Sequence, residues 1–286
     1  MIGNHDFLVM KNILIPYNFS EVAINALNYT KQLFKGVEAT IYLLDVYVSQ
    51  PSELLSEEKN DKWFNEMDDE IENELKYLIE VLNREESSFT FEKLVASNSL
   101  TKAVVNAIKD KNIDVVVTGT KGAKSLAETF IGTNTMKMIT AINDCPLIVV
   151  PMNYKYKPLH QIVFSTNYKR QYSAKELQFL VSLSALKKCL VEVVNLSEES
   201  FLTENQQKHK VRLREMLQDL NVVYKKIDWE GSETSTIEKH IDETDSELLV
   251  LINHKYNFFN RLLEENVIKK SAFHSKIPIL ILPEIT

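Results

Sequence analysis

Several residue types are scarce in this chain of 286 residues. It contains six glycines and two cysteines, and its apolar runs are eight residues long or shorter. A membrane-spanning helix needs about 20 apolar residues, so we expect no membrane span. Cys145 and Cys189 supply neither a disulfide framework nor a zinc site, and we expect both to be reduced and packed. Residues 1–10 lack the basic and apolar regions of a secretory signal, so we expect a cytoplasmic protein.

The motifs of several enzyme classes are also missing. The sequence has no G-x4-G-K-[ST] phosphate loop, no G-x-G-x-x-G dinucleotide fingerprint and no G-x-S-x-G nucleophile elbow. Its six histidines show neither H-x3-H nor H-E-x-x-H spacing, so we predict no protein metal site. No residue is therefore predicted to be catalytic.

The net charge of −7 is unevenly distributed. Residues 51–90 contain thirteen acidic and four basic residues, which leaves the rest of the chain at +2. An acidic chain is not typical of a nucleic-acid-binding protein. Apolar residues recur at helical spacing through this segment, so we predict an amphipathic helix near residues 56–86 whose acidic face is either solvated or binds a basic partner. A basic stretch at residues 208–214 faces either this acidic helix or another subunit in our interpretation.

One pattern of segments occurs twice in the chain. Residues 11–16 and 160–165 are each a short apolar strand, and each is followed by a serine that can cap a helix, Ser20 and Ser173. Strands and helices then alternate in the same order in both halves. Short apolar strands that alternate with helices indicate a parallel sheet covered on both faces. We therefore predict an α/β protein of two tandem, doubly wound, five-stranded Rossmann-like domains.

The predicted domains span residues 1–152 and 158–286. A short polar linker separates them, so the two copies are expected to pack together. Each copy ends in an apolar strand that would be an exposed edge, and exposed edges invite pairing. We predict that these two strands pair with each other and form an intramolecular pseudo-dimer; a homodimer of whole chains stays open.

A glycine-rich loop is the strongest functional signal. Gly119, Gly122 and Gly132 follow an apolar strand, and a helix is predicted to begin near Thr133. Glycines allow the backbone to approach a phosphate, and a helix N-terminus adds unpaired N–H groups with a positive dipole end. The alternative is that these glycines serve only turns and caps, with no ligand.

The pattern Gly119-x2-Gly122-x9-Gly132-Thr133 resembles the ATP-binding signature of the universal stress protein family. The opening segment, residues 13–21, resembles the first strand and loop of the same family, and the resemblance covers nearly the whole chain as a tandem pair. It implies a fold like that of adenine nucleotide alpha-hydrolases and binding of ATP, or of AMP or ADP. It also implies a role in stress responses without an assigned reaction.

The resemblance implies a set of site residues. Adenosine would be held by Pro16, Tyr17, Asn18 and Val46, and ribose and phosphates by Gly119, Lys121, Gly122, Gly132, Thr133 and Asn134. The family usually has an aspartate at the position of Asn18, and the amide keeps the hydrogen bonding but loses the negative charge. Whether Mg²⁺ accompanies the nucleotide stays open.

The second copy lacks the glycine loop. Aligned at equal spacing, Asn253, Tyr256, Asn266 and Val267 replace the three glycines and Thr133. We predict that this copy has lost nucleotide binding. Three functions stay open: a nucleotide-dependent regulatory protein with an unknown protein partner, an interaction module that needs no nucleotide, and a weak ATPase with slow hydrolysis.

Overall fold

The structure is a computed structural model that describes residues 10–46, 73–85, 88–97, 99–121, 133–195, 202–253 and 276–285. The chain forms two compact units, residues 10–118 and residues 119–286. Across the described ranges, no helix combines the length and the apolar character that a membrane crossing requires.

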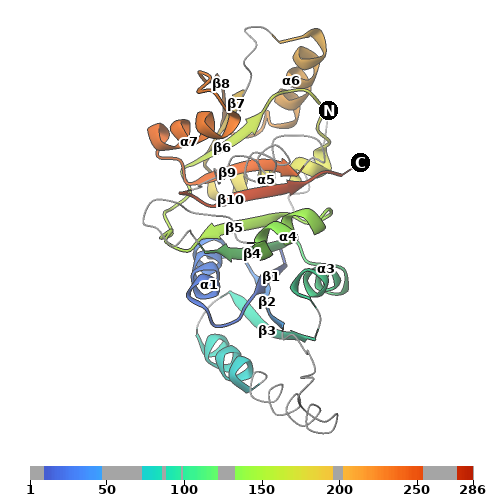
Figure 1. Ribbon diagram of the computed structural model, residues 1–286, viewed down its shortest axis with the longest axis vertical. Helices are drawn as coiled ribbons and strands as arrows, with labels where there is room; N and C mark the ends of the chain where they lie inside the picture. The colour runs from blue at the N-terminus through green and yellow to red at the C-terminus, as the bar shows by residue number, and fades with distance from the viewer. Residues whose placement is uncertain are drawn as a thin grey trace, which may run out of the picture. The chain divides into compact units, whose positions relative to one another are not determined.

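The unit at residues 10–118 contains parallel strands with helices beside them. Its strands are β1 (Asn12–Pro16), β2 (Ala39–Val46), β3 (Phe89–Ala96) and β4 (Val115–Thr120), of which β4 continues into the second unit. β1 pairs in parallel with both β2 and β4, and β2 pairs with β3. Two helices, α1 (Glu21–Leu33) and α3 (Leu100–Asp110), flank these strands (Figure 1).

Burial explains why these segments form strands and helices. Ile13, Leu14 and Ile15 of β1 are all fully buried, as expected of a strand covered on both faces. The predicted cap of α1 is confirmed, because the Ser20 side chain accepts a hydrogen bond from the backbone N–H of Ala23.

The predicted acidic helix is described in part. Residues 73–84 are helical, and Leu75 and Leu82 of the predicted apolar stripe are buried. An ion pair between Lys31 and Glu85 (Nζ to Oε2, 2.5 Å) ties the end of this helix to α1. The stripe positions before residue 73 lie outside the described residues.

The unit at residues 119–286 holds the rest of the elements. In chain order they are α4 (Thr133–Ala141), β5 (Leu147–Pro151), β6 (Gln161–Thr166), α5 (Ala174–Lys187), β7 (Leu190–Asn195), α6 (Glu204–Met216), β8 (Val222–Lys226), α7 (Glu233–Thr244), β9 (Leu248–Asn253) and β10 (Ile279–Pro283). The strands lie in the order β5-β10-β9-β6-β7-β8, and all of these neighbours are parallel except β5 and β10. The predicted α/β class with a mainly parallel sheet is confirmed.

The pairing of β5 with β10 is antiparallel and self-complementary. Ile148 lies opposite Leu280, Leu147 opposite Ile281, and Val149 opposite Ile279. Leu147-Ile148-Val149 and Ile279-Leu280-Ile281 occupy the same positions in the two copies, so the register is symmetric about the central pair. This confirms the predicted pairing of the two final strands, with the self-matching geometry of a two-fold contact.

A second repeated contact fixes the alignment of the two copies. Oδ2 of Asp114 accepts hydrogen bonds from the N–H groups of residues 11 and 12, and Oε2 of Glu247 accepts them from residues 160 and 161, at 2.8–3.0 Å. Asp114 and Glu247 are therefore equivalent positions of the two copies. Counted from them, Gly119 of the first copy aligns with Ile252 of the second. The sequence alignment, which placed Asn253 there, was wrong by one residue. The second copy still has a bulkier residue, Ile252, at the position of the first glycine. The domain boundaries at residues 1–152 and 158–286 stay a prediction.

The two cysteines provide a test of the packing. Neither is in a disulfide, both are buried, and burial raises the pKa of Cys189 to about 11. At pH 8 the thiolate fraction of Cys189 is then roughly 200-fold lower than that of an unfolded cysteine. We expect neither thiol to react with Ellman's reagent at pH 8 in the native protein, and both to react at once in guanidinium chloride. Rapid labelling of the native protein would contradict this packing.

Candidate functional site

The first group of predicted site residues lies at the carboxyl ends of β1 and β2. Pro16 is the last residue of β1, and Val46 is the last residue of β2. The backbone N–H of Tyr17 donates to the carbonyl oxygen of Leu44 at 2.8 Å, so the loop after β1 is attached to β2. The structure thus brings these predicted adenosine contacts to one edge of the parallel strands. Ligands of open α/β sheets bind at this edge.

The loop after β1 has a defined internal structure. The Tyr17 ring is buried, with its pKa raised by burial, and it meets the Phe19 ring edge-on at a centroid distance of 5.2 Å. Phe19 has a φ of 58°, an uncommon backbone conformation for a residue other than glycine. Oδ1 of Asn18 accepts from Oγ of Ser20 at 2.7 Å. The Asn18 oxygen therefore supports the start of α1, and its NH₂ group is what it can present to a ligand. An aspartate would present a second acceptor oxygen instead.

Sequence reasoning missed one buried carboxyl group at this edge. Asp45 comes directly before Val46 and is buried. Burial raises the pKa of Asp45, a hydrogen bond from the Val46 N–H opposes that shift, and the nearby Glu74 carboxylate adds to it. The signal was available, because Asp45 is the one charged residue in the apolar run of β2. It is a candidate acceptor for an amino or hydroxyl group.

The second group of predicted site residues lies around the start of α4. Thr133 and Asn134 are its first two residues, and both are exposed. Oγ1 of the next residue, Thr135, donates to the carbonyl oxygen of Gly119 at 3.4 Å, so the N-terminus of α4 lies beside the end of β4. Lys121 follows β4 and is exposed. These residues present N–H groups, a hydroxyl and an ammonium group, all suited to an anion. Gly122 and Gly132 lie outside the described residues.

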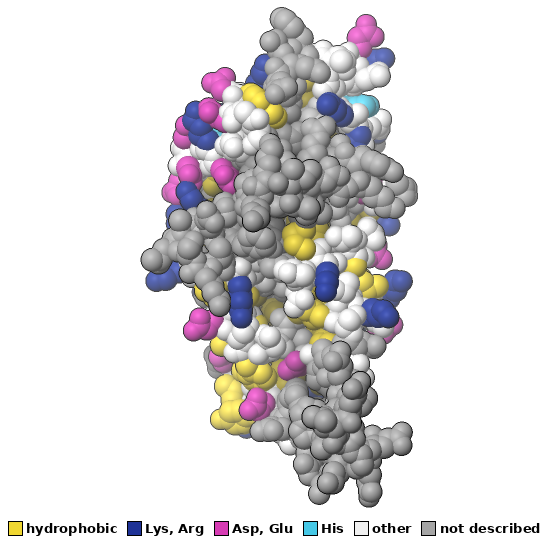
Figure 2. Space-filling view, in the orientation of Figure 1, with side chains coloured by type: hydrophobic (Ala, Val, Ile, Leu, Met, Phe, Trp, Pro, Cys, Tyr) yellow, Lys and Arg dark blue, Asp and Glu magenta, His cyan; other side chains and the backbone are white. Residues whose placement is uncertain are grey.

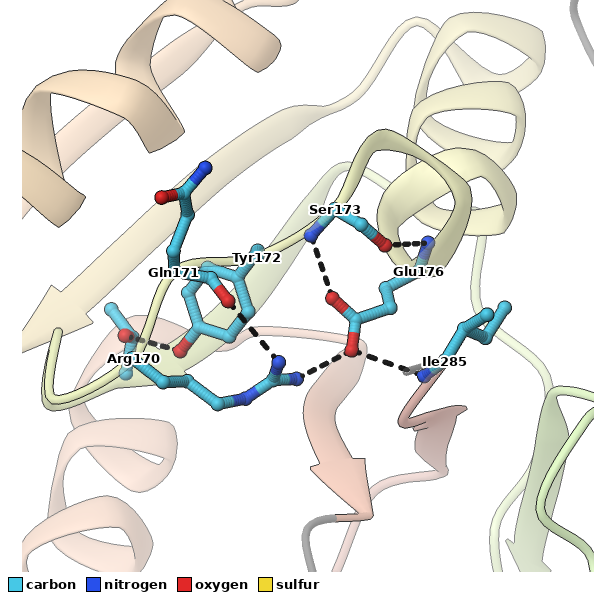
Figure 3. A network of polar contacts seen from close by, with 7 residues as sticks. Arg170, Gln171, Tyr172, Ser173, Glu176 and Ile285 are labelled. Atoms are coloured by element: carbon cyan, nitrogen blue, oxygen red, sulfur yellow. Dashed lines mark hydrogen bonds and ion pairs between the residues drawn. The ribbon is translucent and has the colours of Figure 1, made fainter.

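In the second copy, the loop after β6 is held by hydrogen bonds to a buried carboxylate at the start of α5. The side chain of Glu176 is 1% exposed and takes three hydrogen bonds. It accepts from the Ser173 N–H at 2.7 Å, from Nη2 of Arg170 at 2.8 Å and from the Ile285 N–H at 3.2 Å (Figure 3). Ser173 and Glu176 also form a capping box at the start of α5, which confirms the predicted cap.

Buried aromatic side chains complete this closure. The Tyr172 hydroxyl lies 2.6 Å from Oγ1 of Thr166, which also accepts from the Tyr168 N–H at 3.1 Å. The guanidinium of Arg170 lies 4.8 Å from the centre of the Tyr172 ring. Residues 12 and 161 are equivalent positions of the two copies. Counted from them, the capping serine Ser173 comes four residues later than Ser20, so the loop after β6 is four residues longer than the loop after β1. The polar groups of Thr166, Tyr172, Arg170 and Glu176 are paired within this region, and the loss of nucleotide binding in this copy stays a prediction.

Comparison with known proteins identifies the family of this chain. Residues 10–151 match the model of the universal stress protein family. The chain belongs to the universal stress protein family. It is 26% identical to universal stress protein MJ0577 of Methanocaldococcus jannaschii over 160 residues, which are 51% of this chain and 98% of that protein.

Solved structures of this family share the fold. The crystal structure of a universal stress protein from Archaeoglobus fulgidus matches with a TM-score of 0.68 at 15% identity, over 96% of this chain and 98% of that one. A putative universal stress protein from Pseudomonas aeruginosa matches with a TM-score of 0.56 at 12% identity, over 96% and 93% of the two chains. At such identities the likeness concerns the fold alone.

Proposed function

We propose that this universal stress protein binds ATP, or the related AMP or ADP, through its first half and acts as a nucleotide-dependent regulatory protein in the cytoplasm. The observation that carries the proposal is the hydrogen bond between Thr135 and Gly119, because it sets the N-terminus of α4 beside the strand end from which the glycine loop departs. A helix N-terminus beside a glycine loop is an anion site built from backbone groups.

Each group of residues has a proposed role. Lys121, Thr133 and Asn134 bind the phosphates, together with the loop glycines. Pro16, Tyr17 and Val46 hold the adenosine at the ends of β1 and β2, and Asn18 donates through its amide nitrogen. Because Asn18 carries no charge and its oxygen is bonded to Ser20, we propose that any accompanying Mg²⁺ is held by the phosphate oxygens.

The second copy is proposed to serve as a partner for the first rather than as another binding site. Around the loop after β6, Arg170 pairs with the carboxylate of Glu176 on α5, and the Thr166 hydroxyl pairs with the Tyr172 hydroxyl. We therefore expect one nucleotide per chain, whose occupancy alters how the protein meets its protein partner.

The test begins with the nucleotide that copurifies with the protein, followed by calorimetric titration with ATP. Gly122→Val and Thr133→Val are each expected to weaken binding at least about tenfold, because the first places a branched side chain where the backbone must approach phosphate and the second removes a hydroxyl donor. Thr140→Val is the matched control: Thr140 is exposed on the same helix and donates to the Met136 carbonyl, away from the N-terminus.

The outcomes separate the candidate functions. One ATP per chain, weakened in both variants and unchanged in the control, supports the proposal. A folded protein that binds no ATP at millimolar concentration is an interaction module that needs no nucleotide. Two ATP molecules per chain would contradict a single site, and turnover above the uncatalysed rate would identify the protein as a slow ATPase.

A further inference from the structure

The helix at residues 73–84 presents an acidic face with an apolar centre. Glu74, Tyr77 and Glu80 follow one another at a spacing of three residues, and all three are exposed, Tyr77 to 70%. Val81, one helical turn after Tyr77, is exposed as well. In the space-filling view, hydrophobic and acidic side chains lie side by side over this helix, which is turquoise in Figure 1 (Figure 2). An aromatic ring as exposed as this one is a candidate anchor for a partner.

The helix α6 presents a face of opposite charge with the same spacing. Lys208, Val211 and Arg214 also follow one another at a spacing of three residues, and all three are exposed, Val211 to 54%. Figure 2 shows basic side chains and a histidine over α6. Residues three apart on a helix lie on one side of it, so each helix carries a row of charge, apolar group and charge.

Two cations of α6, Lys210 and Arg214, lie over aromatic rings and close to each other. The Arg214 guanidinium lies 4.8 Å from the centre of the Tyr224 ring, and Nζ of Lys210 lies 5.7 Å from the centre of the Tyr168 ring. Partial burial, followed by the charge of Arg214, lowers the pKa of Lys210. An acidic partner would lower the electrostatic repulsion between these neighbouring positive charges.

We propose that the row Glu74–Tyr77–Glu80 of one molecule binds the row Lys208–Val211–Arg214 of a second copy of this chain. The equal spacing lets each carboxylate meet a cation while Tyr77 packs on Val211, whether the two helices run parallel or antiparallel. We infer a second copy as the partner because every molecule carries both faces: residues 51–90 have a net charge of −9, and the rest of the chain has a net charge of +2.

The two faces differ from each other, so the contact is heterologous. Each molecule that joins leaves one acidic and one basic face open, and the assembly grows head to tail. It does not depend on the proposed nucleotide site. Exposed ion pairs around one small apolar contact are weak and screened by salt, so we expect association at high concentration and low ionic strength only.

The experiment is sedimentation equilibrium of the full chain at about 0.5 mM protein, in about 20 mM and about 500 mM salt. The wild type is expected to show an average mass above that of a single chain in low salt and the single-chain mass in high salt. An acidic-face variant, Glu74→Gln with Glu80→Gln, and a basic-face variant, Lys208→Gln with Arg214→Gln, are each expected to remain single chains. All four positions are exposed, so both variants should fold.

Mixing the two variants gives the sharpest result. The basic-face variant keeps a working acidic face and the acidic-face variant keeps a working basic face, so an equimolar mixture has one usable contact and should stop at a dimer. Lys102→Gln with Lys109→Gln on α3 removes the same charge elsewhere and should associate like the wild type. The proposal is overturned if the wild type stays a single chain in low salt, if either face variant associates normally, or if the mixture forms no dimer.

Discussion

Glu192→Gln is expected to lower the free energy of unfolding by about 3 kcal/mol at pH 7. The Glu192 side chain lies on β7 and is 1% exposed. Nε2 of His240 on α7 donates to its Oε2 at 2.6 Å, Nε2 of Gln161 on β6 donates to the same oxygen at 3.1 Å, and Lys225 on β8 pairs with its other oxygen. Removing the negative charge leaves Lys225 without its counterion and the buried imidazole without its charged acceptor, and the neutral amide replaces only part of the hydrogen bonding.

The pH dependence of this effect follows from the direction of the Glu192 pKa shift. Burial by itself would raise the pKa, but hydrogen bonds from Lys225 and His240, with their charges, bring it below its usual value. A lowered pKa in the folded state means that the charged group stabilises the protein above the unfolded pKa of about 4.3, and that this contribution disappears as the pH falls through the folded pKa. The difference between wild type and Glu192→Gln should therefore be full at pH 7 and shrink below pH 4.

Urea unfolding at several pH values measures both effects. Glu215→Gln is the matched control, because Glu215 pairs with Arg212 at an exposed position on α6 and its loss should cost less than about 0.5 kcal/mol. A cost at Glu192 that is as small as the control, or that does not change with pH, would refute the role of this carboxylate.

Glu176→Ala is expected to have the second large effect, also about 3 kcal/mol at pH 7. Its carboxylate binds Arg170, whose side chain is 19% exposed, and accepts two backbone N–H groups, from Ser173 and Ile285 (Figure 3). The substitution leaves a largely buried cation and two backbone donors without their acceptor, and it also removes half of a capping box.

Urea unfolding measures the loss of stability in Glu176→Ala, and limited proteolysis tests whether its C-terminal residues become accessible. Because Glu176 holds the Ile285 N–H, the C-terminal residues should become susceptible to carboxypeptidase in Glu176→Ala under native conditions. Glu204→Ala, an acidic residue in the first turn of α6 that is exposed, is the control. Equal stability of the two variants, with the C-terminus still protected, would show that the network in Figure 3 contributes little.

Much of the fold could be predicted from local sequence. Apolar runs such as the one in β1 are too short for buried helices and lie between helical patterns, so a parallel sheet was the consistent solution. Ser20 and Ser173 cap helices as predicted, because a cap depends only on residues within one turn. The pairing of β5 with β10 was predictable because both are apolar edges that need a neighbour.

The candidate site was predictable only in part. A loop and the start of a helix were predicted from the spacing of the glycines, Lys121 and Thr133 alone. The sequence alignment of the second copy was wrong by one residue. The glycines of the first loop have no counterpart there, so equal spacing alone could not determine which residues are equivalent. Strand register, read from the Asp114 and Glu247 contacts, was needed instead.

The sequence by itself determined the class of the fold, the order of its elements, the caps of two helices and the place of the glycine loop. These depend on periodicity and on residues that are neighbours in the chain. Only the tertiary structure decided that Glu192 meets His240 and Lys225, that Glu176 binds the backbone N–H of Ile285 after β10, and that Asp45 is buried beside Val46. These contacts depend on which strands become neighbours, and the energies of buried charges exist only once water has been excluded around them.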